Sequence, residues 1–93
     1  MATLVDENGR LTVSGELNFE TVTTLWKQSL LFLAKYPVIH IDLSKVTTSN
    51  SAGLALLVEW LKYGKREKKT IHFSGIPLQL QSIAEVANVG FLR

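Results

Sequence analysis

Small polar side chains gather at one junction of the sequence, where they run directly into a glycine and an apolar block. The stretch is TTSNSAGLALL, residues 47–57. Serine, threonine and asparagine oxygens accept the free backbone N–H groups that begin a helix, so this junction predicts a helix N-terminus. A hydroxyl there can also carry a phosphate, stabilised by the helix dipole, or donate a hydrogen bond to a partner. Capping needs one such residue and five are present, so Ser51 is a candidate both for capping and for binding.

The two residues after Ser51 are small. Ala52 and Gly53 allow either close packing of the helix start against a sheet or the close approach of a partner to Ser51. The sequence is compatible with both uses.

Asp42 and Ser44 end the stretch VIHIDLS, which has the apolar pattern of a strand. A carboxylate in this position could act as a catalytic acid or base. At a strand end, however, aspartate more commonly accepts hydrogen bonds from the backbone and hydroxyl groups that follow. We therefore expect Asp42 and Ser44 to shape the following loop.

His40 and His72 occupy matching places in VIHIDL and TIHFSG. Two strand histidines raise the question of a metal site, but no third ligand has suitable spacing. We expect them to lie on the faces of neighbouring strands. The sequence also lacks a glycine-rich phosphate loop and a serine with a histidine base at recognisable spacing, so we expect no metal, no cofactor and no enzymatic activity.

The elements that position these residues follow from hydrophobic periodicity and turn signals. Asn8-Gly9 predicts a tight hairpin between two strands. Asn18 suits a helix N-cap, Pro37 follows the end of that helix, and Pro77 begins another. The expected elements are strands 2–6 and 10–15, helix 18–35, strand 38–43, helix 51–68, strand 70–75 and helix 77–88, with Gly90 beyond the last helix.

This order predicts an α/β fold: a single mixed sheet of about four strands, with about three helices mainly on one side. The N-terminal hairpin is antiparallel, and right-handed crossovers make the later strands parallel. Strand 38–43 is nearly unbroken in its apolar character, as expected of a central strand covered on both faces. Ser51 would then follow the carboxyl end of that strand, where sites in open α/β sheets are found.

The helix that begins at Ser51 has more apolar surface than one stripe requires. At roughly 100° per residue, the stripe facing the sheet comprises Leu54, Leu57, Val58 and Leu61. The flank or far side carries Leu56, Trp60 and Tyr63. An aromatic flank next to Ser51 favours a protein interface, although a neighbouring helix or loop could cover it instead. Trp26, on the apolar face of the first helix, is expected in the core.

Composition restricts the class of protein. The 93 residues, 46% apolar and 19% charged, suit a single globular domain spanning residues 1–93. Cysteine is absent, which excludes disulfides and a cysteine nucleophile.

The net charge of +2 is too small to indicate nucleic acid as a partner. The basic stretch 62–69 suits either the solvated end of a helix or a docking patch for an acidic partner. Without a signal peptide or an apolar run of about 20 residues, we expect a cytoplasmic domain that does not insert into a membrane.

Three motifs together resemble the STAS domain: SGEL at 14–17, IDLSKV at 41–46 and NSAGLALL at 50–57. STAS domains include anti-sigma-factor antagonists, whose loop typically has the sequence Asp-Ser-Ser-Gly with a phosphorylated first serine. The resemblance places Ser51 at that first serine, with Asn50 at the acidic position, Ala52 at the second serine and Gly53 at the glycine. It implies that Ser51 belongs to a partner-binding site and is a possible phosphorylation site.

The GLALL sequence and the Leu25-Trp26 pair are more similar to the STAS subunits of Mla-type phospholipid ABC transporters. That resemblance implies a non-catalytic subunit of a Gram-negative bacterium, which binds and regulates or stabilises a cytoplasmic, MlaF-like ATPase joined to a permease. Such a subunit would help to maintain outer-membrane lipid asymmetry and would associate peripherally with the inner membrane. Asn50 departs from the usual acidic residue, which disfavours roles that need a charge there, such as metal-assisted phosphotransfer.

Two functions stay open at this point. The first is the transporter subunit, which Asn50 and GLALL favour. The alternative is an anti-sigma-factor antagonist in a phosphorylation-controlled switch, with an anti-sigma factor or serine kinase as partner. Both functions use the same expected partner-binding residues, which are Asn50, Ser51, Ala52, Gly53, Leu56, Trp60 and Tyr63.

Overall fold

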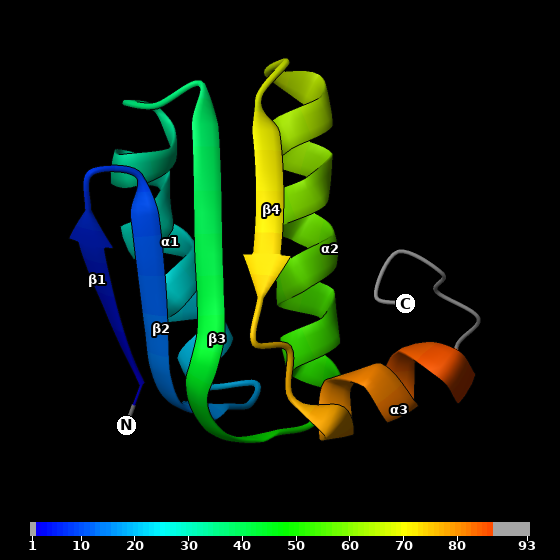
Figure 1. The fold of residues 1–93 in the computed structure, drawn as a ribbon. Helices are drawn as coiled ribbons and strands as arrows, with labels where there is room; N and C mark the ends of the chain where they lie inside the picture. The colour runs from blue at the N-terminus through cyan, green and yellow to red at the C-terminus, as the bar shows by residue number, and fades with distance from the viewer. Residues whose placement is uncertain (1, 87–93) are drawn as a thin grey trace.

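A four-stranded mixed sheet and three helices make up the part of the chain that the computed structural model describes, residues 2–86 (Figure 1). The elements are β1 (Thr3–Glu7), β2 (Arg10–Leu17), α1 (Thr21–Leu33), β3 (Val38–Ser49), α2 (Ser51–Arg66), β4 (Thr70–Ser74) and α3 (Leu78–Val86). The strand order is β1-β2-β3-β4, with β1 antiparallel to β2 and the other neighbours parallel. This confirms the predicted α/β fold with β3 in a central position. The end of the predicted third helix, residues 87–88, and Gly90 lie outside the described residues.

The turn between β1 and β2 is set by Asn8 and Gly9. Their φ angles are 53° and 90°, and a type I′ hairpin turn requires such positive values at both positions. The Gly9 N–H donates a hydrogen bond of 3.0 Å to Asp6 Oδ1, and the Tyr36 hydroxyl donates one of 2.9 Å to Asp6 Oδ2. The second bond raises the pKa of Tyr36, because it stabilises the protonated phenol. The predicted hairpin is thus tied to the segment before β3.

β3 continues to Ser49, well beyond the strand 38–43 that the sequence pattern indicates. Residues 44–49, expected to form a loop, extend the strand and pair with β2. The β-branched run Val-Thr-Thr at 46–48 favours extended backbone, although its polar character resembles that of a loop. α2 therefore begins directly after the end of a strand.

The helices cover one face of the sheet. In Figure 1, α1 and α2 both lie behind the strands, and α3 contacts α2 and β3. Along β3, Ile39, Ile41 and Leu43 are buried, whereas His40 is exposed and Asp42 is half-buried. The prediction of helices mainly on one side is confirmed, but the prediction that strand 38–43 is covered on both faces is wrong. The histidine and the aspartate within VIHIDL face the uncovered side.

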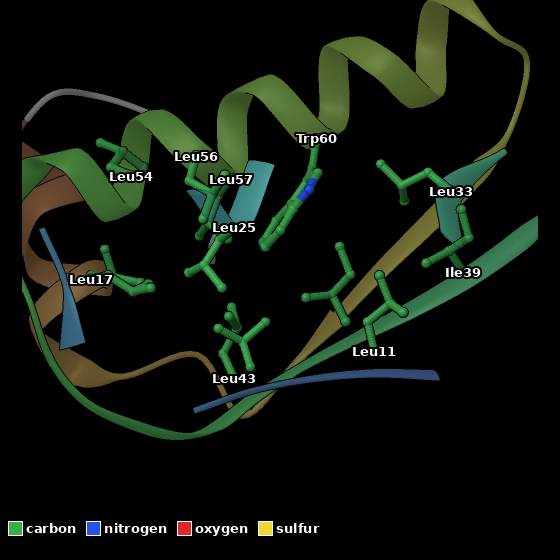
Figure 2. Close-up of a cluster of buried hydrophobic side chains, with 13 residues drawn as sticks. Leu11, Leu17, Leu25, Leu33, Ile39, Leu43, Leu54, Leu56, Leu57 and Trp60 are labelled. Carbon is green, nitrogen blue, oxygen red and sulfur yellow. The ribbon is translucent and has the colours of Figure 1, made fainter. Parts of the chain in front are cut away.

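Trp60 lies in the core between α2 and the sheet (Figure 2). It is 0% exposed and Leu56 is 3% exposed, so the prediction that they lie on an exposed flank is wrong. The buried stripe of α2 runs through Gly53, Leu57, Trp60 and Gly64, at the helical spacing i, i+4, i+7 and i+11. Its two glycines carry no hydrophobic signal. Because the prediction used only the large apolar residues, it placed the buried face of α2 to one side of its position in the structure.

The indole N–H of Trp60 finds its acceptor inside the core. It donates a hydrogen bond of 2.9 Å to Ser29 Oγ, and this hydroxyl donates one of 2.7 Å to the Trp26 carbonyl oxygen. Ser29 is itself 0% exposed. The bond joins α2 to α1 in an apolar interior, where removal of one partner leaves the other unpaired.

Lys69 differs from the rest of the basic stretch. Its Nζ donates hydrogen bonds to the carbonyl oxygens of Leu33 and Tyr36, at the end of α1. α1 has no basic residue in its own last turn, so this ammonium group supplies the charge that favours a helix C-terminus. The other members of the stretch are exposed, as expected at the solvated end of a helix: Lys62, Lys65, Arg66 and Lys68.

We expect Trp60→Ala to lower the free energy of unfolding by about 3–5 kcal/mol, because it removes a fully buried aromatic side chain. Ser29→Ala should lower it by about 1–3 kcal/mol, since the indole N–H would stay buried without an acceptor. Gln28→Ala, at an exposed position of α1, is the control and should change it by less than about 0.5 kcal/mol. Urea denaturation followed by circular dichroism measures all three. An unchanged urea midpoint for Trp60→Ala would contradict the core assignment.

Candidate functional site

The carboxyl ends of β2, β3 and β4 meet at one edge of the sheet, because these strands are parallel. This is the lower edge in Figure 1, and it holds the β2–α1, β3–α2 and β4–α3 junctions. Asn50 and Ser51 lie at the β3–α2 junction and are both exposed. The residues that the sequence singled out therefore lie at an accessible edge of the sheet.

Asn50, rather than Ser51, caps α2. Its Oδ1 accepts a hydrogen bond of 2.8 Å from the Ala52 N–H, and its own backbone N–H donates one of 3.1 Å to the Leu17 carbonyl oxygen. Asparagine caps a helix about as well as aspartate, so the missing acidic residue leaves the helix start intact and removes a negative charge. Ser51 is the first helical residue, and its hydroxyl makes no hydrogen bond with the residues that the structure describes. That hydroxyl is therefore available to a partner.

Ala52 and Gly53 serve close packing. Both are buried, and a Cβ atom on Gly53 would overlap Ser49 Oγ and lie 3.1 Å from Leu80 and 3.2 Å from Leu17. Glycine therefore lets α2 begin close to the sheet without displacing these side chains. Of the two uses that the sequence allows, the structure shows this packing, and the approach of a partner to Ser51 over these small residues stays a prediction.

The predicted aromatic flank of α2 also lies largely in the interior. Leu56 and Trp60 belong to the core. Tyr63 is half-buried against Trp26, with ring centroids 6.3 Å apart in an edge-to-face arrangement. Of the predicted partner-binding residues, the structure leaves Asn50 and Ser51 exposed.

Two large apolar residues that sequence reasoning missed lie at the neighbouring junctions. Phe19, between β2 and α1, is 72% exposed, and Leu78, at the start of α3, is 78% exposed. Exposed apolar side chains beside a candidate site are typical of protein interfaces. Their signal in the sequence is an apolar residue within a turn, in LNFET and IPLQ. We call Phe19, Asn50, Ser51 and Leu78 the junction surface.

Side-chain hydrogen bonds hold the backbone beneath the junction surface. Asn18 Oδ1 accepts from the N–H groups of Glu20 at 2.9 Å and Thr21 at 3.0 Å, in the turn that leads into α1. The N-cap position itself is Glu20, without a side-chain cap hydrogen bond, so Asn18 orders this turn from two residues before the cap and is not the predicted cap itself. Gln79 Oε1 accepts a hydrogen bond of 3.0 Å from the Ser49 N–H, which joins the start of α3 to the end of β3. The β3–α2 and β4–α3 junctions are thus joined by a hydrogen bond. The bond from the Asn50 N–H to the Leu17 carbonyl oxygen joins the β2–α1 and β3–α2 junctions in the same way.

An apolar groove of about 200 Å³ lies between α1 and α2. Its lining residues are Val22, Thr23, Trp26, Ala55, Leu56 and Glu59. Trp26, predicted to be core, is only partly buried and forms part of the groove wall. Ala55 lies one helical turn after Ser51, so the groove continues from the junction surface along the same side of α2.

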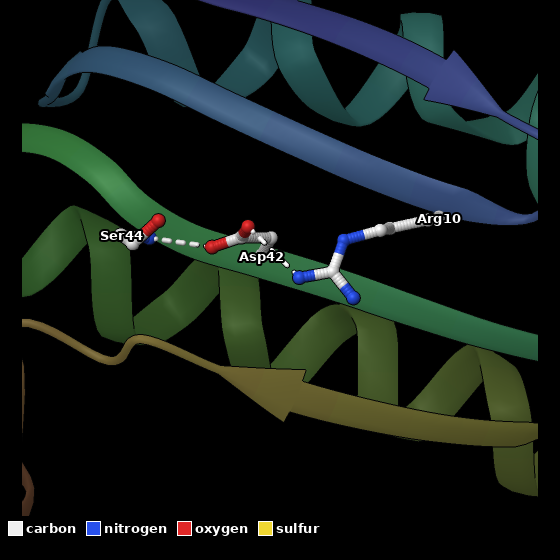
Figure 3. A network of polar contacts seen from close by, with 3 residues as sticks. All are labelled: Arg10, Asp42 and Ser44. Atoms are coloured by element: carbon white, nitrogen blue, oxygen red, sulfur yellow. Dashed lines mark hydrogen bonds and ion pairs between the residues drawn. The ribbon is translucent and has the colours of Figure 1, made fainter.

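Asp42 and Ser44 lie within β3 rather than in a loop (Figure 3). The Ser44 N–H donates a hydrogen bond of 2.9 Å to Asp42 Oδ1, and Arg10 Nη2 donates one of 3.1 Å to Asp42 Oδ2. The pairing of β3 with β2 shifts register here, so these residues shape a bulge in the strand, which corrects the loop-shaping prediction. The hydrogen bonds from Ser44 and then the Arg10 guanidinium lower the pKa of Asp42. Its carboxylate is thus ionised and engaged in structure.

His40 and His72 lie side by side on β3 and β4, as predicted. Within the described part of the chain, no three or more His, Cys, Asp or Glu residues are grouped so that they could hold a metal ion. None of the helices described there is long and apolar enough to cross a membrane.

Comparison with known proteins identifies the family. A family model described as "Mlab, STAS domain" matches residues 1–93. No curated protein matches the sequence. Among solved structures, the chain is similar to a chain of the Acinetobacter MlaFEDB complex in an ATP-bound conformation. The two are 28% identical with a TM-score of 0.71, and the match covers 88% of this chain and 87% of that one.

Two anti-sigma-factor antagonists share the fold at lower identity. One, from Mycobacterium paratuberculosis, is 22% identical with a TM-score of 0.71, over 96% of this chain and 78% of that one. The other, SpoIIAA in its unphosphorylated form, is 14% identical with a TM-score of 0.65, over 97% of this chain and 84% of that one. The mixed sheet with three helices agrees with these folds, and the family model spans the whole sequence. The chain therefore belongs to the STAS domain family, in the group whose model is described as Mlab, STAS domain.

Proposed function

We propose that this chain is a non-catalytic STAS subunit that binds and stabilises the cytoplasmic ATPase of a phospholipid-transporting ABC complex of the Mla type. The observation that carries the proposal is the match of the Mlab family model to the whole sequence. The similarity to a chain of the MlaFEDB complex, at 28% identity, supports it further. The chain would lie at the cytoplasmic side of the inner membrane of a Gram-negative bacterium, held there by the ATPase and its permease.

The junction surface is the proposed contact with the ATPase. It combines two exposed apolar side chains, Phe19 and Leu78, with the hydroxyl of Ser51 and the amide of Asn50. Apolar anchors supply most of the affinity of an interface, and a hydroxyl at a helix start can donate a hydrogen bond to the partner's backbone. None of the four side chains is charged, so burying them avoids the large desolvation penalty of an ionised group.

The groove between α1 and α2 extends this contact. We assign it to one apolar side chain of the ATPase that reaches past Ser51 toward Trp26 and Leu56. A cavity of about 150 Å³ admits a molecule the size of benzene, so a groove of about 200 Å³ has room for such a side chain. The subunit would regulate the ATPase by binding one of its conformations more tightly than the others.

The second candidate is an anti-sigma-factor antagonist, whose partner is an anti-sigma factor or a serine kinase. Its support is the exposed Ser51 hydroxyl at the start of α2, where the helix dipole would stabilise an added phosphate. The same surface serves both functions, so the identity of the partner distinguishes them.

Capture of the partner tests the proposal. The chain, immobilised through its C-terminus, is incubated with lysate of its own bacterium, and the bound proteins are identified by mass spectrometry. We expect an ABC ATPase together with a permease. Recovery of a small serine kinase in their place would overturn the transporter function in favour of the antagonist.

Ser51→Glu should weaken binding of the purified ATPase at least tenfold, which is about 1.4 kcal/mol, because it places a charge in an uncharged interface. The free energy of unfolding should change by less than about 0.5 kcal/mol, since an acidic residue is favourable in a first helical turn. Gln28→Glu, which adds the same charge on the exposed side of α1, is the matched control and should bind normally. Isothermal calorimetry and urea denaturation on each variant give the two quantities. Wild-type affinity in Ser51→Glu would remove Ser51 from the contact.

A further inference from the structure

The uncovered face of the sheet carries two imidazoles that neither the core nor the junction surface uses. His40 and His72 are register partners on the neighbouring parallel strands β3 and β4. Their rings are stacked, with centroids 4.9 Å apart and planes at 24°. Both side chains are exposed, so solvent reaches them from the open side of the sheet. They are the two histidines of the sequence.

Two neighbouring imidazoles form the simplest chelate for a late transition-metal ion. Neutral imidazole binds Zn²⁺, Cu²⁺ and Ni²⁺, with metal–nitrogen distances of about 2.0–2.1 Å. Two nitrogens on one ion therefore lie roughly 3–4 Å apart. Stacked rings direct their nitrogen lone pairs in nearly parallel directions, so both side chains must rotate about their torsions for one nitrogen of each to meet at a single ion. Both side chains are exposed and free to turn, while the paired strands hold the backbones in place.

We propose that His40 and His72 form a two-histidine binding site for a divalent late transition-metal ion, with water completing the coordination. Among the residues that the structure describes, no third ligand is grouped with the pair, so these residues do not form a closed structural site of the zinc-finger kind. This does not exclude a solvent-exposed chelate, because the open face leaves room for water ligands. Bound metal would tie β4 to β3, since each strand contributes one ligand.

The charges around the pair limit its affinity. Asp42 shares the uncovered face, two residues after His40, but its carboxylate oxygens accept hydrogen bonds from Arg10 and Ser44. Arg10 is also the register partner of His40 on β2, which brings a positive charge close to the site. Arg10 therefore opposes a bound cation in two ways: through its own charge and by occupying the nearest carboxylate.

Isothermal calorimetry of the full chain without an affinity tag, titrated with NiCl₂ at neutral pH, tests the site. We expect one Ni²⁺ per chain for the wild type and at least a tenfold loss of affinity in both His40→Gln and His72→Gln. Arg10→Gln should bind Ni²⁺ several-fold more tightly, because it removes the nearby charge and releases Asp42. Circular dichroism confirms that each variant is folded.

Equal affinity in the wild type and both histidine variants would overturn the proposal. A stoichiometry of one Ni²⁺ per two chains would also overturn it, since the metal would then bridge separate copies. If a variant does not fold, paramagnetic broadening of the wild-type amide signals by Cu²⁺ replaces it. Broadening centred on residues 40 and 72 supports the site, and broadening centred elsewhere contradicts it.

Discussion

The approach of α2 to the sheet depends on the absence of a side chain at Gly53. A Cβ atom there would overlap Ser49 Oγ at the end of β3 and press on Leu17 and Leu80, so any other residue would require these side chains or the helix start to shift. Gly64 plays the same part three turns later, where a Cβ atom would lie 3.0 Å from Ile71. Between the two glycines, Leu57 and Trp60 fill the space against the strands. Close contact at both ends of α2 therefore fixes where the helix begins.

The position of the candidate site follows from this contact. Because α2 begins directly on the end of β3, Asn50 can cap the helix and bond to the last residue of β2 at the same time. Ser51 is then exposed at the start of the helix, and the exposed side chains of Phe19 and Leu78 belong to the neighbouring junctions. The two ends of α2 thus differ in chemistry. The first turn carries no charged residue, whereas the last carries exposed Lys65 and Arg66.

Local signals predicted the elements whose cause is local. Asn8-Gly9 gave the hairpin because both residues tolerate positive φ, and the position of Ser51 followed from strand and helix order. The interior of α2 could not be read in the same way. Gly53 and Gly64 lie on its buried stripe for steric reasons, so a search for large apolar residues assigned Trp60 to the surface. Phe19 and Leu78 carry a weak local signal, an apolar residue within a turn, but their meeting at one edge depends on the sheet topology that joins three separate junctions. Trp26 is less buried than predicted and Trp60 more buried, because the placement of α1 beside α2 decides how far each of them is enclosed.

Hydrogen–deuterium exchange, compared between the free chain and its complex with the ATPase, shows directly whether the partner binds at the carboxyl edge of the sheet. We expect slower exchange on binding in residues 18–23, 50–56 and 78–80, which contain the junction surface and the entrance of the groove. We expect unchanged exchange in residues 65–72, which contain the basic end of α2 and the first half of β4. Slower exchange confined to residues 65–72, with the junction surface unaffected, would place the partner at the opposite end of α2 and rule out the junction surface as the contact.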